Sequence, residues 1–223
     1  MATANGSALR AAADLPDELC AHVAAFAWTL DDAVECESLA LVRLVHRGQG
    51  KGTFRAMNIA AGRGLLDMVR FLHVHRSEGC SSLAMNLAAA RGHLDVVRFL
   101  HRFRHEGCTA FAMDAAAVNG HLQIIRFLHE QRVNGFSTRT IDAGAAHGHY
   151  SVVEYLLTNR NDGFSVAAVD RAMENGHVEI VELLMRDARQ RTGRKLFTKL
   201  GIQWAARNND KRFAEYVHIL QAQ

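Results

Sequence analysis

The chain repeats one pattern of apolar and polar positions along most of its length. In its clearest copy, residues 113–129, a run of small apolar residues precedes Asn-Gly-His and a longer amphipathic stretch. In that stretch Leu122, Ile125 and Leu128 recur every third residue, which places them on one face of an α-helix. Equivalent glycines stand 28 residues apart at Gly64, Gly92, Gly120, Gly148 and Gly176. A fixed period of this length predicts stacked, similar units.

Each unit is predicted to contain two short α-helices. The first helix should begin after a Ser or Thr N-cap and end at the repeated glycine, which suits the left-handed residue that follows a helix. The second helix should carry the apolar stripe and be closed by a second glycine. The expected N-caps are Ser81, Thr109, Ser137 and Ser165, and the expected closing glycines are Gly79, Gly107, Gly135 and Gly163. Helices this short are marginally stable alone, so each must bury its stripe against the next unit.

The period divides the chain into a tail, a cap and an array, and it predicts an all-α helical-repeat solenoid. Within the cap, we expect residues 33–47 to form the second helix of a degenerate repeat, and Asp17–Trp28 to form a helix that covers it. The predicted segments are a flexible N-terminal tail at 1–13, an N-terminal helical cap with the degenerate first repeat at 14–55, a repeat array at 56–223 and, within the array, a C-terminal capping repeat at 196–223.

Composition and charge exclude several classes of function. The 223-residue chain is 49% hydrophobic, yet no apolar run approaches the roughly 18–20 residues that cross a bilayer. Residues 43–108 hold eleven Lys and Arg against four acids, whereas residues 109–185 hold five against nine. This banding lacks the sustained basic stripe of a nucleic-acid-binding protein. Because no signal peptide is evident, we expect an intracellular protein whose cysteines are reduced: Cys20, Cys36, Cys80 and Cys108.

Histidine and acidic or amide residues recur at fixed positions, which raises the question of a metal site. The recurring positions are His93, His121, His149 and His177 after the glycine; His73, His101 and His129 at the end of the second helix; and Asn58, Asn86, Asp114, Asp142 and Asp170 in the first helix. Members of one ladder are one repeat, about 8–10 Å, apart. Zinc needs several ligands within about 2.0–2.3 Å of one point. The ladders therefore predict hydrogen bonding within and between repeats and no metal.

No catalytic motif is present in the sequence. Gly48–Thr53 is rich in glycine but lacks the spacing of a phosphate-binding loop, and no Gly-x-Ser-x-Gly nucleophile motif occurs. We therefore expect no catalytic residues and no cofactor, and an enzyme is the least favoured alternative.

The segment Ala88–Leu100 reads Ala-Ala-Ala-Arg-Gly-His-Leu-Asp-Val-Val-Arg-Phe-Leu and resembles the ankyrin repeat. The resemblance recurs over residues 33–220. The unit here is about five residues shorter than the ankyrin unit of about 33 residues, and the difference falls in the β-hairpin finger that projects from each ankyrin repeat. The resemblance therefore implies a solenoid of ankyrin-like helix pairs with shortened or absent fingers, and a protein-protein interaction module or scaffold.

The same resemblance implies where a partner binds, because ankyrin proteins use the finger tips and the exposed face of the first helices. With shortened fingers, the helix positions should carry more of the contact. By motif match these are Leu87, Arg91, Val118, Asn119, His147, Arg171, Glu174, Asn175, Trp204, Arg207 and Asn208. We expect reversible binding of another protein by a monomer.

Near the N-terminus, residues 15–23 resemble the start of an F-box, whose Leu-Pro opening and first helix bind the adaptor of a ubiquitin ligase. The matching positions are Leu15, Pro16, Leu19 and Val23, on a possible helix at 15–27. The alternative function is therefore that of a substrate adaptor of a ubiquitin ligase. The F-box interpretation competes with the repeat register for residues 31–47.

Overall fold

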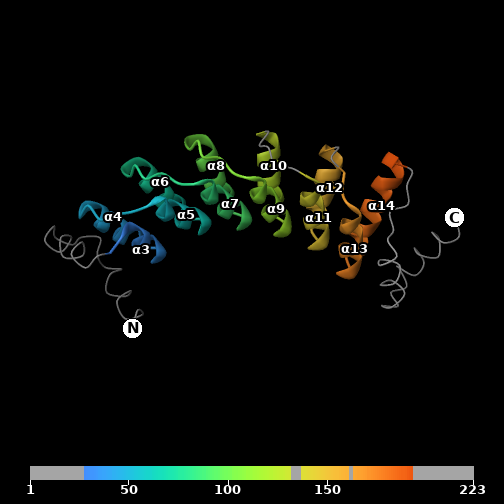
Figure 1. Ribbon diagram of the computed structural model, residues 1–223, viewed down its shortest axis with the longest axis horizontal. Helices are drawn as coiled ribbons and strands as arrows, with labels where there is room; N and C mark the ends of the chain where they lie inside the picture. Colours follow the sequence, from blue (N-terminus) through green and yellow to red (C-terminus); the bar gives the residue numbers. More distant parts are fainter. Residues whose placement is uncertain (1–27, 132–136, 161–162, 193–223) are drawn as a thin grey trace. The chain divides into compact units, whose positions relative to one another are not determined.

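The computed structural model describes residues 28–131, 137–160 and 163–192. These residues form twelve α-helices and no β-strand (Figure 1). The helices are α3 (Leu30–Glu35), α4 (Leu39–Arg47), α5 (Phe54–Gly62), α6 (Leu66–His75), α7 (Ser82–Ala90), α8 (Leu94–Phe103), α9 (Ala110–Val118), α10 (Leu122–Glu130), α11 (Thr138–Ala146), α12 (Tyr150–Asn159), α13 (Val166–Glu174) and α14 (Val178–Thr192). The predicted all-α repeat fold is confirmed.

The chain divides into two compact units, Met1–Ala112 and Met113–Gln223, called here the N-terminal and C-terminal units. Within the units, consecutive helices pack in pairs such as α3 with α4 and α13 with α14, and helices such as α4 and α12 also pack against their counterparts in the next pair, α6 and α14. Thus α5 contacts α6 and α7 in the N-terminal unit, and α11 contacts α12 and α13 in the C-terminal unit. None of the helices in the described ranges is long and apolar enough to cross a membrane.

Small residues of the first helices and branched residues of the second helices form the core. Ala60, Ala61, Ala88 and Ala89 are completely buried, and so is Val97 on α8. Alanine side chains allow neighbouring first helices to approach closely, which a row of larger residues would prevent. The packing of short helices on their neighbours supplies stability that none of them has alone.

The predicted N-caps are confirmed. The hydroxyl of Ser81 accepts a hydrogen bond from Leu83 N at 3.3 Å, and Ser137 and Ser165 do the same two residues further along their helices, each at 3.2 Å. Thr109 accepts from Phe111 N at 3.3 Å. These bonds satisfy backbone donors that have no partner within the helix.

The repeated glycines have the left-handed backbone that the sequence predicts. The φ angles of Gly64, Gly92, Gly120, Gly148 and Gly176 are 74°, 85°, 72°, 81° and 76°. A second constraint appears only in the structure. A Cβ atom on Gly64 would lie 2.5 Å from Nδ1 of His93, and one on Gly120 would lie 2.5 Å from Nδ1 of His149. The histidine of the following repeat therefore covers the glycine, and a side chain is excluded for steric as well as conformational reasons.

The second set of glycines does not close the second helices, so that prediction is wrong. Helices α6, α8 and α12 end four residues earlier, at His75, Phe103 and Asn159, and the arginine that follows each of them has an extended backbone. Gly79, Gly107 and Gly163 have φ angles of 71°, 64° and 73°. They turn the loop toward the next first helix; Gly135 lies outside the described residues.

Residues 33–47 do not form a single second helix of a degenerate repeat, so this prediction is also wrong. They contain the end of α3, a turn and α4. Glu37 has a φ of 56° and stands 27 residues before Gly64, so a glutamate occupies the place of the repeated glycine. Without a glycine there, no residue in the sequence marked the turn. The tail at 1–13, the proposed covering helix up to residue 27 and the capping repeat at 196–223 lie outside the described residues and stay predictions.

Candidate protein-interaction surface

A ladder of hydrogen bonds fixes each first helix to the next. Asn58 Nδ2 donates to Ser81 Oγ at 2.9 Å, and Asn58 Oδ1 accepts from Ser81 N at 3.1 Å. The same pair of bonds joins Asn86 to Thr109, at 2.9 and 3.0 Å. This confirms the predicted hydrogen bonding between repeats, and it sets the rotation of each first helix by tying its N-cap to the helix before it.

The ladder begins one repeat earlier than the sequence suggested. Asp31 on α3 accepts hydrogen bonds from the backbone N and the hydroxyl of Thr53, at 3.1 and 2.8 Å. In the C-terminal unit, Asp142 accepts from Ser165 N at 2.9 Å and from its hydroxyl, while Asp114 accepts from Thr140 Oγ1 at 2.7 Å. Asp31 identifies α3 as a first helix, which the pattern of apolar residues did not reveal.

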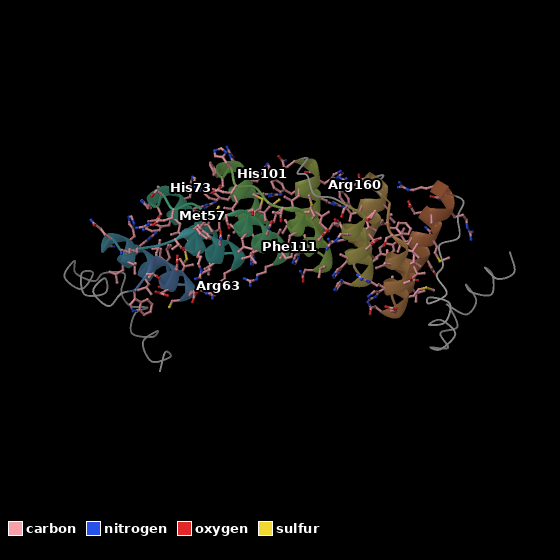
Figure 2. All side chains as sticks on the ribbon, in the orientation of Figure 1. Met57, Arg63, His73, His101, Phe111 and Arg160 are labelled. Carbon is pink, nitrogen blue, oxygen red and sulfur yellow. The ribbon has the colours of Figure 1, made fainter. Side chains whose placement is uncertain are left out.

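The framework brings the residue two positions after each N-cap to the surface. In the N-terminal unit these residues are Arg55, Leu83 and Phe111, and Leu83 and Phe111 are 46% and 55% exposed. Phe54, the first residue of α5, is 50% exposed. Figure 2 shows Phe111 on α9. Sequence reasoning missed these positions, although a large apolar residue that falls outside the buried register of a helix is a signal that could have found them.

Two of the predicted site residues lie side by side on the N-terminal unit. Leu87 is half-buried, and its Cβ lies 3.0 Å from where a Cβ on Gly62 would be. Arg91 is exposed, and its Nη1 donates to the Gly62 carbonyl at 2.9 Å. Gly62 in α5 thus leaves room for Leu87 of α7 and for Arg91, which directly follows α7, so both side chains belong to a surface made by two helices.

The predicted residues of the C-terminal unit are mostly exposed and polar. Arg171 and Glu174 are exposed on α13, and no hydrogen bond of their side chains is part of the helix framework described above. Val118 is half-buried at the end of α9. Trp204, Arg207 and Asn208, and the adaptor-type positions Leu15, Pro16, Leu19 and Val23, lie outside the described residues and stay predictions.

The residue before each repeated glycine has a structural role that the sequence did not predict. Arg63 Nη1 donates to the Glu35 carbonyl, and Asn175 Nδ2 donates to the Ala146 carbonyl at 2.7 Å, as Arg91 does to Gly62. Asn119 and His147 instead bond a carbonyl of their own helix, Ala115 O and Ala143 O, each at 2.9 Å. The bonds to Glu35, Gly62 and Ala146 satisfy carbonyls that a helix C-terminus leaves without partners, whereas Ala115 O and Ala143 O also accept from the backbone N–H of Asn119 and His147. The five side chains are therefore partly framework and partly surface.

On the second helices, histidines pack against aromatic rings of the next repeat. His46 meets Phe71 and His73 meets Phe99 edge to face, with ring centroids 5.5 Å apart in both pairs. Nδ1 of His46 and Nδ1 of His73 are buried without a hydrogen-bond partner. Figure 2 shows His73 and His101 on α6 and α8, at the opposite side of the N-terminal unit from Arg63. The predicted hydrogen bonding of the histidines is thus wrong for Nδ1 of His73.

Other histidines do form the predicted bonds. His129 Nδ1 lies 2.9 Å from the Tyr155 hydroxyl, and His149 Nε2 lies 2.7 Å from the Val118 carbonyl.

Burial lowers the pKa of His46, and the nearby charges of Arg76 and His75 lower this pKa further. In the described ranges no three His, Cys, Asp or Glu side chains are grouped so that they could hold a metal ion.

Two of the described thiols, those of Cys80 and Cys108, are unsuited to nucleophilic chemistry. Cys36, Cys80 and Cys108 are free, and Cys20 lies outside the described residues. Burial raises the pKa of Cys80 to about 11, with a further contribution from the Glu106 carboxylate, and burial also raises the pKa of Cys108. A thiol needs to ionise to attack or to bind metal, so these two remain protonated near neutral pH.

The family is identified by the repeats themselves. A family model described as ankyrin repeats (3 copies) matches residues 57–137 and 85–170. This chain belongs to the ankyrin repeat family. Ankyrin repeats are generally protein-protein interaction modules, and the family is typically non-enzymatic. Comparison with curated proteins finds no match.

Proposed function

We propose that this ankyrin-repeat chain binds a partner protein reversibly, as a monomer, through the exposed face of its first helices. The observation that carries the proposal is the contrast between a uniform framework and a variable surface. Ser81 and Ser165 cap their helices in the same way, yet the solvent-facing positions that follow differ: the exposed Leu83 and half-buried Leu87 on α7, and the exposed Ala167 and Arg171 on α13. Packing does not determine which residues occupy these positions, so binding to a partner can determine them.

The partner is proposed to be an intracellular protein. Three free cysteines are consistent with a reducing compartment, where structural disulfides are rare. Neither a metal nor a cofactor is required, because the binding side chains are supplied by helices held in place by backbone and side-chain hydrogen bonds. Function of this kind lies in the surface that the fold displays rather than in the fold itself.

The proposal is tested by mutating the surface without touching the framework. The full-length chain is used to capture proteins from extracts of the source cell, and each protein identified by mass spectrometry is purified and titrated. Leu83→Asp on α7, the double variant Arg171→Ala with Glu174→Ala on α13, and Trp204→Ala should include at least one change that weakens binding about tenfold, because a few residues carry most interface energy.

Gln123→Ala is the matched control, since Gln123 is exposed on the second helix α10. It should leave the affinity unchanged, and circular dichroism should show that every variant remains folded. Wild-type affinity in all three first-helix variants, or equal weakening by Gln123→Ala, would refute binding through this face.

A further inference from the structure

The first-helix face of the N-terminal unit carries a row of apolar side chains. Leu83 on α7 and Phe111 on α9 are large, exposed and in equivalent positions, each two residues after an N-cap. Ile59 and Leu87 are half-exposed one helical turn further along α5 and α7. The packing of α5 on α7 and the Asn86–Thr109 bonds hold the three helix starts next to one another. Exposed apolar groups in a continuous row mark an interaction site.

Positive charge accompanies this row. Neither α5 nor α7 contains an Asp or Glu, whereas Arg55 lies on α5 and Arg91 directly follows α7. Both arginines and Lys51, before α5, are exposed. Arg91 uses Nη1 to hold Gly62, and a guanidinium has five N–H groups in all. Arg55 stands on α5 where Leu83 stands on α7, so the face combines apolar residues on α7 and α9 with basic residues on α5 and at the end of α7.

Two of the three acids of the adjacent helix α3, Asp31 and Asp32, are occupied by the framework, and so is Glu37, which follows the helix. Asp31 accepts two bonds from Thr53, Asp32 closes the capping box with Thr29, and Glu37 pairs with Arg63 at 3.3 Å. Of these carboxylates, that of Glu37 neutralises Arg63. The charge of Arg55 helps to lower the pKa of Asp32, but none of the ion pairs that the structure shows includes Arg55 or Arg91. A ligand that brings its own carboxylates to this face would supply the missing negative charge.

We propose that α5, α7 and the start of α9 bind an acidic segment of the partner protein that carries large apolar side chains. The apolar side chains pack on Leu83, Leu87 and Phe111, and carboxylates of the segment bond Arg55 and Arg91. Large apolar anchors supply most of the affinity of such an interface. Charge-assisted bonds to arginine add orientation and speed the encounter. This inference rests on the proposed function, and it goes further by naming the partner's chemistry and the helices that meet it.

The test uses a phage-displayed library of random peptides that are long enough to span α5, α7 and the start of α9. The library is selected on the full-length chain. Enriched peptides should combine Asp or Glu with Leu, Ile, Phe or Trp. A fluorescently labelled peptide of this set should bind the wild-type chain and lose about tenfold in affinity to Leu83→Asp and to Arg55→Glu. Raising the salt concentration from about 0.15 M to about 0.5 M should weaken binding several-fold, because screening reduces the charge term.

Val74→Asp is the matched control, because Val74 is an apolar residue on α6 that is 72% exposed and lies on a second helix. It introduces the same charge as Leu83→Asp and should leave peptide binding unchanged. Enrichment of basic or uncharged peptides, no enrichment at all, or equal loss in Val74→Asp would each overturn the inference.

Two outcomes separate this inference from the proposed function. If the peptides lose affinity to Arg171→Ala with Glu174→Ala but not to Leu83→Asp, the first-helix face binds but the acidic segment does not lie on α5 and α7, and the inference is overturned. If light scattering shows a dimer of the chain that Leu83→Asp converts to a monomer, the face binds a second copy and the inference is again overturned. The proposed function itself falls if the captured whole proteins bind every first-helix variant with wild-type affinity, or if Gln123→Ala weakens their binding equally.

Discussion

Helices α7 and α13 occupy equivalent places in the two units and show what the repeat fixes and what it leaves open. Both are nine residues long, begin after a serine N-cap and are followed by a glycine with positive φ. Their solvent-facing positions differ: α7 presents Leu83 and the half-buried Leu87, whereas α13 presents Ala167 and Arg171 at the same two positions. One framework therefore supports two leucines on α7 and an alanine with a charged arginine on α13.

The physical reason is that burial constrains a residue much more strongly than exposure does. Ala88 and Ala172 are completely buried at equivalent positions, and either one enlarged would push neighbouring helices apart. An exposed side chain on the same helix changes stability by little. Surface residues can therefore differ between repeats, while core residues cannot. Substitutions in the framework should change the free energy of unfolding equally in the two units if both share that framework.

The largest effect is expected from the repeated glycines. Gly64→Ala in the N-terminal unit and Gly120→Ala in the C-terminal unit should each lower the free energy of unfolding by about 2–4 kcal/mol. About 1–2 kcal/mol comes from placing a side chain in the left-handed region, and the remainder comes from forcing the covering ring of His93 or His149 to move. Urea denaturation followed by circular dichroism measures the loss.

Gly107→Ala is the control for the conformational part alone. Gly107 has a φ of 64°, and no heavy atom of the described residues lies within 4 Å of the place that a Cβ would occupy. Its loss should therefore stay near about 1–2 kcal/mol. Equal losses at Gly64 and Gly107 would contradict a role for the histidine, and unequal losses at Gly64 and Gly120 would contradict a common framework.

An intermediate effect is expected in the ladder, where the N-terminal unit has Asn86 and the C-terminal unit has Asp142 at equivalent positions. Asn86→Ala should cost about 1–3 kcal/mol, because it leaves the backbone N–H of Thr109 without its acceptor. Asn86→Asp should cost less, since a carboxylate accepts the same bond, as Asp142 accepts from Ser165 N.

The reciprocal variant, Asp142→Asn, sharpens this test. It keeps an acceptor for Ser165 N, and the serine hydroxyl can accept from the new amide as Thr109 does from Asn86. Melting temperatures of the three variants measure the order of stability. A loss for Asn86→Asp as large as for Asn86→Ala would show that the two units do not tolerate the same ladder residues.

The smallest effect is expected from pH. The pKa of His46 in the folded chain is below its ordinary value of 6.5, first because the ring is partly buried and then because of the charges of Arg76 and His75, which the charge of Glu78 opposes. As pH falls through 6.5 the unfolded chain binds this proton more readily, so stability that is present above 6.5 is lost on acidification. Urea denaturation at about pH 7.5 and about pH 5.5 should show the decrease, and His46→Leu should reduce it. An unchanged pH dependence in His46→Leu would show that other groups cause it.

Much of the fold could be predicted because local rules govern it. The period, the hydroxyl N-caps, the glycine turns and the apolar stripes each depend on residues close in sequence, and the structure confirms them. The turn at Glu37 could not be predicted, since glutamate gives no sign of a left-handed backbone. The ends of α6 and α8 were misplaced because the arginines that follow have no intrinsic preference for the extended conformation they adopt.

The candidate surface was predictable only in part. The family resemblance placed Leu87, Arg91, Arg171 and Glu174 on the first-helix face, and none of the four is buried. It missed Leu83 and Phe111, because an apolar residue near a helix start is more often part of the core. It also did not show that the position of Arg91 bonds the preceding helix, since that contact joins residues 29 positions apart.

The sequence by itself determined that this chain is a series of paired helices, because helix starts, helix ends and buried stripes depend on the preferences of neighbouring residues. Only the tertiary structure decided which copies of one register position face solvent, which histidine covers which glycine, and which side chains bind the carbonyls of the preceding repeat. Those outcomes depend on how closely residues about one repeat apart in the sequence lie to each other. The size and shape of the facing side chains determine that distance.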